Sequence, residues 1–273
     1  AARQHVTVAL SGDGGDELFG GYNRYFWGPK IWDRFALLPH PVRSGLGKVI
    51  QSVPLSVWDA AGFQYNRLRS GSTGISMLGD KAYRLGDSLR TVKTTDELYR
   101  SLVSEWPLEA RIMLGISKDL TSQIDDPLPE NGVDDPAMLM MVQDMRSYLP
   151  DNILCKVDRA AMGVSLETRT PFLDPDVIAL AARLPMSMKI RNDQGKWALR
   201  QVLYQHVPRE MIERPKAGFA IPIGIWLRGP LRDWAEELLS YELLEKDGFF
   251  DPEIIRQTWA EHLSGRRDWT TRL

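Results

Sequence analysis

Residues 10–21 read Leu10-Ser11-Gly12-Asp13-Gly14-Gly15-Asp16-Glu17-Leu18-Phe19-Gly20-Gly21, a cluster of glycines and acids. They follow Val6-Thr7-Val8-Ala9, a short run whose β-branched residues favour a strand. Glycine lets the backbone turn sharply and approach a ligand closely, because no Cβ atom blocks either move. Loops at strand ends in open α/β sheets commonly bind ligands. The sequence therefore predicts a strand followed by a tight turn that faces a ligand.

Two carboxylates, Asp13 and Asp16, lie inside this turn. Free amides in such a loop favour phosphate, and a carboxylate reaches phosphate only through a metal ion. The alternative is a tight turn capped by aspartate, in which both acids are merely solvated. An EF-hand fits poorly because the acids miss its alternate spacing, and no Gly-Lys-Ser/Thr follows to make a P-loop.

The composition is that of an ordinary globular chain, with 273 residues of which 43% are hydrophobic and 26% charged. A net charge of -2 argues against a nucleic-acid-binding surface. No apolar run approaches the ~20 residues of a membrane helix. The single cysteine, Cys155, cannot form an internal disulfide, which fits a reducing cytoplasm. The four histidines show no paired metal-ligand spacing.

Most of the remaining pattern predicts helices. A capping box at Thr94 to Glu97 and the pairs Asp135-Pro136 and Asp174-Pro175 mark helix starts. Few other stretches are typical of strands, so we expect a mainly helical fold with only a remnant of a parallel sheet. The partners of the first strand are then expected upstream of residue 1, and the chain is expected to be a piece of a longer protein.

Several charged groups in the second half admit two interpretations. Pro150 is expected to end a helix and Asp151 to cap the next one, which places Lys156 and Arg159 on one face. They form either a surface salt-bridge set or a basic edge of a nucleotide cleft. Glu167 and Arg169 fall on one side of an extended stretch and are interpreted as an ion pair that braces helix ends.

A lysine-bearing segment, Arg214-Pro215-Lys216-Ala217-Gly218-Phe219, interrupts the helical rhythm after an amphipathic helix expected over residues 196–206. Proline pins the backbone on one side of Lys216 and glycine permits a turn on the other. A lysine on such a loop is normally solvated, and a functional role is the alternative.

Three blocks of sequence, in the same order, resemble the glutamine-hydrolysing asparagine synthetase family. They are Ser11 to Tyr22, Leu149 to Asp174 with its Lys-Val-Asp-Arg and Glu-Thr-Arg-Thr-Pro-Phe-Leu-Asp, and Arg214 to Phe219. The resemblance covers nearly all of residues 1–273 and is least clear over residues 30–130. It implies the carboxy-terminal part of an α/β synthetase domain of the adenine-nucleotide α-hydrolase-like (PP-loop ATPase) type, and so one partial asparagine synthetase domain.

The resemblance also implies a chemistry. The family activates the side-chain carboxylate of aspartate with ATP and Mg²⁺, giving an aspartyl-adenylate and pyrophosphate. Ammonia from a separate glutaminase domain then displaces AMP to yield asparagine. A cytoplasmic location is expected, a homodimer is an open alternative, and no nucleic-acid or membrane partner is expected.

Motif matching assigns roles to five residues. Ser11 and Gly12 would contact the adenylate, largely through the backbone, and Asp16 would be a magnesium ligand on the phosphates. Asp13 stands at an acidic position associated with forming or aminating the acyl-adenylate, where many relatives have glutamate. Lys216 would steady the pyrophosphate and the charge that develops at the reacting carbonyl.

Two departures from the family pattern are clear. The first ATP motif, Ser-Gly-Gly-x-Asp-Ser, occurs nowhere in these residues, and the chain begins with Ala1 where a glutaminase would begin with a cysteine nucleophile. Cys155 falls within an expected helix and is interpreted as a structural thiol. The isolated chain is therefore expected to be inactive.

Two other hypotheses remain open. One is a β-lactam-synthetase-like or sugar-carboxylate amidating relative, which would adenylate a different acid and would be separated by an ATP–pyrophosphate exchange assay with candidate acids. The other is a non-catalytic helical interaction module, which an upstream Ser-Gly-Gly-x-Asp-Ser in the parent gene would argue against.

Overall fold

The computed structural model describes residues 1–68, 78–106, 111–116, 124, 126, 135–213 and 221–273. The chain forms two units: the first holds Ala1–Arg34 and Thr121–Lys216, and the second holds Phe35–Leu120 and Ala217–Leu273. Helix α2 (Arg24–Ala36) leads the chain out of the first unit into the second.

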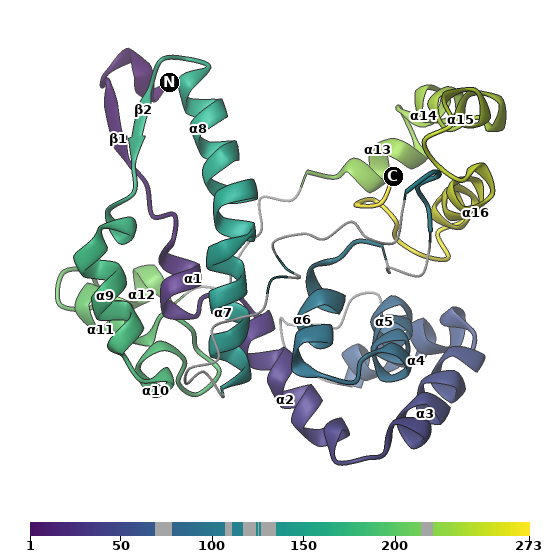
Figure 1. Cartoon of the computed structure of the whole chain (residues 1–273), viewed down its shortest axis with the longest axis horizontal. Helices are drawn as coiled ribbons and strands as arrows, with labels where there is room; N and C mark the ends of the chain where they lie inside the picture. The colour runs from purple at the N-terminus through teal and green to yellow at the C-terminus, as the bar shows by residue number, and fades with distance from the viewer. Residues whose placement is uncertain (69–77, 107–110, 117–123, 125, 127–134, 214–220) are drawn as a thin grey trace. The chain divides into compact units, whose positions relative to one another are not determined.

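The first unit combines one small sheet with short helices (Figure 1). Besides α2, its regular elements are β1 (Val8–Leu10), α1 (Gly15–Phe19), α7 (Pro136–Arg146), α8 (Cys155–Met162), β2 (Glu167–Arg169), α9 (Pro175–Arg183), α10 (Met186–Lys189), α11 (Trp197–Leu203) and α12 (Arg209–Ile212). The predicted mainly helical fold with a remnant of a parallel sheet is confirmed.

The sheet of the first unit pairs β1 with β2 in parallel, in the register Val8↔Glu167 to Leu10↔Arg169. The sequence predicts the partners of the first strand upstream of residue 1, but one partner, β2, lies within the chain. The β2 residues were interpreted as merely extended, because three residues before a proline give a weak strand signal. The Glu167–Arg169 ion pair forms at 2.9 Å, but it lies exposed on β2 rather than at a helix end.

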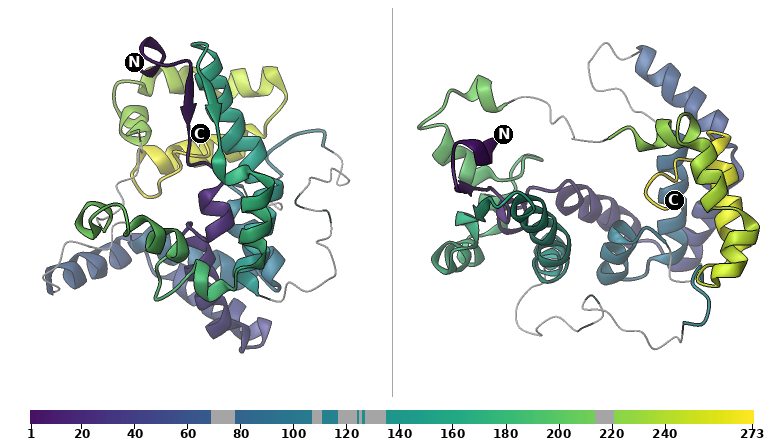
Figure 2. Two further views of the ribbon diagram at one scale, coloured as in Figure 1. Left: turned by 90° about the vertical axis from the view of Figure 1, so that its left-hand side faces the viewer. Right: turned by 90° about the horizontal axis from the view of Figure 1, so that it is seen from above.

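The predicted helix break at Pro150 is also wrong. Helix α7 passes through a π-helical segment, Leu149–Leu154, into α8, and the views of Figures 1 and 2 show a continuous rod. Pro150 lies in the first turn of the π-helical segment, where a missing N–H is tolerated. The Asp151 N–H donates to the Ser147 carbonyl at 3.0 Å, and its side chain caps no helix.

The start of α7 follows the sequence prediction. Asp135 Oδ1 accepts hydrogen bonds from the N–H groups of Ala137 (2.8 Å) and Met138 (3.1 Å). Met140 and Met141 on this helix are fully buried. A second small core lies beside α1, where Leu18, Phe19 and Ala181 are buried. These contacts fix α1, and with it residues 11–21, here called the glycine loop, against α7 and α9.

The described part of the second unit is mainly helical, with one isolated antiparallel bridge between Met113 and Phe250. Its helices are α3 (His40–Ser52), α4 (Leu55–Leu68), α5 (Leu78–Thr91), α6 (Thr95–Val103), α13 (Ile223–Arg228), α14 (Arg232–Leu238), α15 (Tyr241–Asp247) and α16 (Pro252–Leu263). The Thr94 cap is confirmed, since its Oγ1 accepts from the Glu97 N–H at 3.2 Å. Leu227, Ala235 and Trp259 form a buried cluster. Across the described residues of the chain, no helix is both long and apolar enough to cross a membrane.

Candidate functional site

The glycine loop follows β1 and includes the short helix α1. The Ser11 N–H continues the sheet pairing by donating to the Arg169 carbonyl at 2.8 Å. Gly14 then takes a left-handed conformation (φ 85°) and caps α1, which is why the chain reverses within a few residues. Gly12 is exposed, and no atom of the described residues lies within 4 Å of the place where a Cβ would stand. The described part of the chain therefore leaves open space beside the loop backbone at Gly12.

The two aspartates of the loop have different surroundings. Asp13 is half-buried and accepts a short hydrogen bond from the Ser11 hydroxyl (2.5 Å). Asp16, on α1, forms an ion pair through Oδ2 with Lys196 Nζ at 2.9 Å. Asp16 Oδ1 is buried and has no hydrogen-bond donor among the described residues. One oxygen of Asp16 thus pairs with Lys196, and the other is buried beside Gly21 without a hydrogen-bond donor among the described residues.

A reverse turn at residues 190–196, here called the 190s turn, packs against the end of the glycine loop. Asn192 and Asp193 both adopt positive φ (52° and 61°), and Arg191 and Gln194 exchange two backbone hydrogen bonds of 3.0 Å. This is the pattern of a tight two-residue hairpin turn. An ion pair between Asp193 and Lys30 of α2 also holds the turn.

Close backbone approach fixes the 190s turn to the glycine loop. A Cβ on Gly195 would lie 2.1 Å from the Gly20 carbonyl oxygen, so only glycine fits there. The Lys196 N–H donates to the Phe19 carbonyl at 2.9 Å. Lys196 itself has a positive φ of 58° and caps α11. The backbone that places Lys196 beside Asp16 is therefore specified at several points.

A polar network lies behind α1. Glu17 is almost fully buried, and it accepts a hydrogen bond from the Tyr22 hydroxyl at 2.8 Å. Burial raises the pKa of Glu17, and the Tyr22 hydrogen bond opposes that shift. Arg24 pairs with the fully buried Asp144 at 2.7 Å, and its guanidinium lies 4.5 Å from the Tyr22 ring centroid. These contacts connect the residues after the glycine loop to α7.

The sequence-predicted site residues are only partly placed. Ser11, Gly12, Asp13 and Asp16 lie together in one loop, whereas Lys216 lies outside the described residues. No group of three or more histidine, cysteine, aspartate or glutamate side chains gathers as a metal site within the described part of the chain. The proposed roles of these five residues stay predictions.

The basic pair of α8 is exposed. Lys156 and Arg159 lie on this helix and form no ion pair with an acid of the described residues. Cys155 is a free, half-buried thiol at the first position of α8. The choice between a surface role and a nucleotide-cleft role for the two basic residues stays open.

Sequence reasoning missed Lys196 and the 190s turn. Lys196 was expected only as the start of an amphipathic helix, because nothing in its neighbours points to Asp16. A signal for the turn is present, since Asn192-Asp193 followed by Gly195 is typical of tight turns. The contact with the glycine loop depends on tertiary packing and has no local signal.

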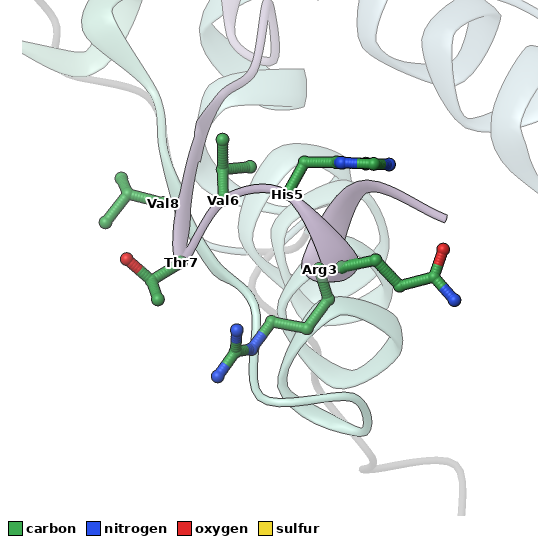
Figure 3. A pocket seen from close by; sticks show the side chains of 6 residues that line it. Arg3, His5, Val6, Thr7 and Val8 are labelled. Carbon is green, nitrogen blue, oxygen red and sulfur yellow. The ribbon is translucent and has the colours of Figure 1, made fainter.

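An open pocket of about 450 Å³ lies at the other end of β1 and is lined by residues 3–8. Figure 3 shows that its labelled side chains, Arg3, His5, Val6, Thr7 and Val8, point in several directions rather than toward one centre. No residue of the glycine loop lines it. We therefore place the candidate site at the glycine loop and not in this pocket.

A glycine- and acid-rich loop between a parallel strand and a helix is typical of α/β ligand-binding domains. The family model for asparagine synthase matches residues 1–273, so the chain belongs to the asparagine synthase family. The helical fold with its two-stranded parallel sheet is consistent with part of a PP-loop synthetase domain.

Proteins with similar sequences agree with this family assignment. A Mycobacterium tuberculosis (strain ATCC 25618 / H37Rv) protein with the provisional name asparagine synthetase (glutamine-hydrolyzing) is 35% identical over the whole chain. Asparagine synthetase (glutamine-hydrolyzing) 1 of Bacillus subtilis is 29% identical over 98% of the chain. The chain spans 38% of the length of both proteins. Amidase chry2 of Gibberella zeae is 23% identical over 91% of the chain, which spans 37% of that protein. No solved structure matches.

Proposed function

We propose that the protein containing this chain is an ATP-dependent ligase that converts aspartate to asparagine through an aspartyl-adenylate. One observation carries the proposal: a chain of the asparagine synthase family bears the loop Ser11 to Gly21 at the end of a parallel strand. The chain covers only part of its relatives, so the proposal concerns the longer protein. Ammonia would come from glutamine through a separate domain, and this chain alone would be inactive.

The loop supports nucleotide binding in a specific way. Gly12 is exposed beside open space, although no packing contact within the described residues requires glycine there. A ligand that approaches the backbone closely would require it. In the proposal, the backbone of Ser11 and Gly12 holds the adenylate. Asp13, half-buried and oriented by the Ser11 hydroxyl, faces the reacting carboxyl group.

Asp16 offers one carboxylate oxygen to a magnesium ion in the proposal. Carboxylate oxygens are preferred magnesium ligands, and Asp16 Oδ1 has no donor among the described residues, whereas Oδ2 pairs with Lys196. In the proposal, Asp16 holds Mg²⁺, which when bound would offset phosphate charge. Lys196, already paired with Asp16, adds a positive charge at the same place.

Lys216 is proposed to oppose the charge of pyrophosphate and of the reacting carbonyl. Adenylation brings an anionic carboxylate to an anionic triphosphate, so cations must offset their repulsion. One charge pair at about 4 Å is worth roughly 4 kcal/mol at an effective dielectric near 20. A positioned lysine therefore supplies up to about a thousandfold in rate.

The acceptor acid is tested by ATP–pyrophosphate isotope exchange on the full-length protein. We expect exchange that depends on aspartate. Exchange with a different acid alone would favour an amidating relative with another substrate, a reading that the similarity to amidase chry2 keeps in view. Absence of exchange with every acid, in a folded full-length protein, would favour a non-catalytic module.

A further inference from the structure

The peptide bond between Gly195 and Lys196 in the 190s turn is held at both of its polar groups. Its N–H, which belongs to Lys196, donates to the Phe19 carbonyl of α1 at 2.9 Å. Its carbonyl, which belongs to Gly195, accepts a hydrogen bond from Arg200 Nε at 3.1 Å. The plane of this peptide is fixed, because rotating it would break one bond or the other. The backbone at Lys196 therefore depends on Arg200 as well as on α1.

Lys196 needs such support, because its backbone adopts a conformation that a side chain disfavours. Its φ is 58° and its ψ is 33°, in the left-handed region. A residue other than glycine persists there only where its surroundings fix it, and such residues cluster at ligand-binding sites. Within the described residues, five non-glycine residues have a positive φ, and three of them are Asn192, Asp193 and Lys196. Backbone strain is therefore concentrated in the turn that carries Lys196.

The side chain of Lys196 runs along the end of the glycine loop to Asp16. A Cβ on Gly21 would lie 2.5 Å from Lys196 Cε, so the lysine stem occupies the space that a side chain at position 21 would need. Lys196 Nζ then pairs with Asp16 Oδ2 at 2.9 Å. Rotation of the Gly195–Lys196 peptide would move this whole stem, so the position of Nζ depends on that peptide.

The guanidinium of Arg200 is itself oriented by a second contact. Arg200 lies on α11, four residues after Lys196, and its side chain is 22% exposed. Its Nη1 pairs with Glu213 at 3.3 Å, while its Nε bonds the Gly195 carbonyl. Glu213 also accepts two hydrogen bonds from Gln194 Nε2, at 3.0 and 3.1 Å. Arg200 thus uses two donors of a planar group, an arrangement that a lysine cannot reproduce.

We propose that Arg200 is a positioning residue, which holds the Gly195–Lys196 peptide so that Lys196 stays beside Asp16 and presents its charge to the nucleotide phosphates. The catalytic consequence rests on the proposed function, whereas the structural part rests on the contacts of Arg200. Arg200 acts through Lys196 and contacts no substrate. The sequence alone does not indicate this role, since an arginine on an amphipathic helix is usually a solvated charge.

The kinetic test is ATP–pyrophosphate isotope exchange by full-length protein carrying Arg200→Gln. We expect the KM for ATP to rise about fivefold with kcat within about twofold of wild type, because Lys196 is displaced and not removed. Arg183→Gln, at an exposed arginine at the end of α9, is the matched control and should leave both constants within about twofold. An unchanged KM in Arg200→Gln would overturn the inference.

A double-mutant cycle separates positioning from an independent effect. If Arg200 acts through Lys196, adding Arg200→Gln to Lys196→Met should change the KM for ATP by less than about twofold beyond that of Lys196→Met alone. Effects on the KM that multiply in the double variant would overturn the inference, since Arg200 would then act without Lys196.

A third test needs no activity. Amide hydrogen exchange at Lys196, measured at residue resolution in ligand-free full-length protein, should be at least about fivefold faster in Arg200→Gln than in wild type and in Arg183→Gln. The Ser11 N–H, which donates to the Arg169 carbonyl, is the internal reference and should keep its wild-type rate. Equal acceleration at both amides, or none at Lys196, would overturn the inference.

Arg200→Lys is the second variant, for use if Arg200→Gln does not fold. It keeps the charge but lacks the fork that reaches both the Gly195 carbonyl and Glu213, so the Lys196 amide should still exchange about threefold faster. A wild-type amide exchange rate in Arg200→Lys would overturn the inference. If wild-type protein shows no ATP–pyrophosphate exchange with any acid, the proposed function fails, whereas the Lys196 amide still reports whether Arg200 holds the peptide.

Discussion

The glycine loop in the first unit and the C-terminal segment after α16 in the second are both irregular, and both are held by polar side chains. In the C-terminal segment most of the described polar and aromatic groups contact one another, although the buried Nε2 of His262 has no hydrogen-bond partner among the described residues. The Trp269 N–H donates to Nδ1 of the fully buried His262 at 3.1 Å, and the Trp269 indole donates to Glu261 at 2.8 Å. Arg267 and Arg272 each lie 4.0 Å from a Trp269 ring centroid.

In the glycine loop, Asp16 Oδ1 has no hydrogen-bond donor among the described residues, and no described atom lies within 4 Å of a Cβ built on Gly12. A buried acceptor without a donor costs about 1–3 kcal/mol, a cost that a bound cation would offset at Asp16 in the proposed function. The two regions differ in exposure: the C-terminal segment packs its charged groups against aromatic rings, whereas the loop presents the exposed backbone of Gly12.

Among the residues that the structure describes, the largest expected effect follows from replacing Asp16. In full-length protein, Asp16→Asn should lower the ATP–pyrophosphate exchange rate at least ~100-fold, because the amide loses the charge that we propose holds Mg²⁺. Exchange assays at several magnesium concentrations measure this. Asp33→Asn, at an exposed acid of α2, is the control. A rate within threefold of wild type would show that the Asp16 carboxylate serves the fold and not the reaction, as the polar groups of the C-terminal segment do.

Gly195→Ala should cost about 2–4 kcal/mol of unfolding free energy, because the new Cβ would clash with the Gly20 carbonyl oxygen. Urea unfolding followed by circular dichroism measures it. Gly45→Ala in α3 is the matched control, since nothing lies within 4 Å of its Cβ position, and it should be neutral or stabilising. Equal effects of the two changes would contradict the close packing of the 190s turn.

Lys196→Met should raise the KM for ATP about tenfold while changing stability by less than about 1 kcal/mol, since the Asp16 pair is partly exposed. Steady-state exchange kinetics and thermal unfolding separate the two effects. Lys246→Met in α15 provides the control, as an exposed lysine of the second unit. A large loss of stability with an unchanged KM would make Lys196 a structural residue.

The smallest expected effect is on the pH dependence of stability, through His262 of α16, which contacts the C-terminal segment. Burial, helped by Arg228, lowers the pKa of His262. The unfolded chain then binds a proton more readily, so stability falls as pH drops below about 6.5, the unfolded pKa. Thermal midpoints from about pH 8 to about pH 5.5 should fall more steeply in wild type than in His262→Gln. His206→Gln, at an exposed histidine, should keep the wild-type slope. Identical slopes in all three proteins would show that His262 does not titrate as described.

Local signals in the sequence predicted local structure well. Asp135 and Asp174 cap α7 and α9 because the hydrogen bonds involved span two or three residues. The strand before the glycine loop was predicted from β-branched residues next to glycine. Pro150 was misjudged because a π-helical segment accommodates a missing N–H that an α-helix does not.

Distant pairings could not be predicted in the same way. Nothing near Glu167 indicates that its strand pairs with Val8, and nothing near Lys196 indicates Asp16. Such contacts arise from packing between segments far apart in the chain. The roles assigned to Ser11, Gly12, Asp13, Asp16 and Lys216 came from family resemblance. In the structure, the first four lie between the end of β1 and the first turn of α1.

The most direct test of the proposed chemistry is aspartate-dependent ATP–pyrophosphate exchange by full-length protein carrying Lys216→Ala, with circular dichroism to confirm folding. We predict a loss of about a thousandfold with an unchanged fold, because the proposed counter-charge to pyrophosphate is removed. Near-normal exchange in that variant would contradict the synthetase mechanism at this site.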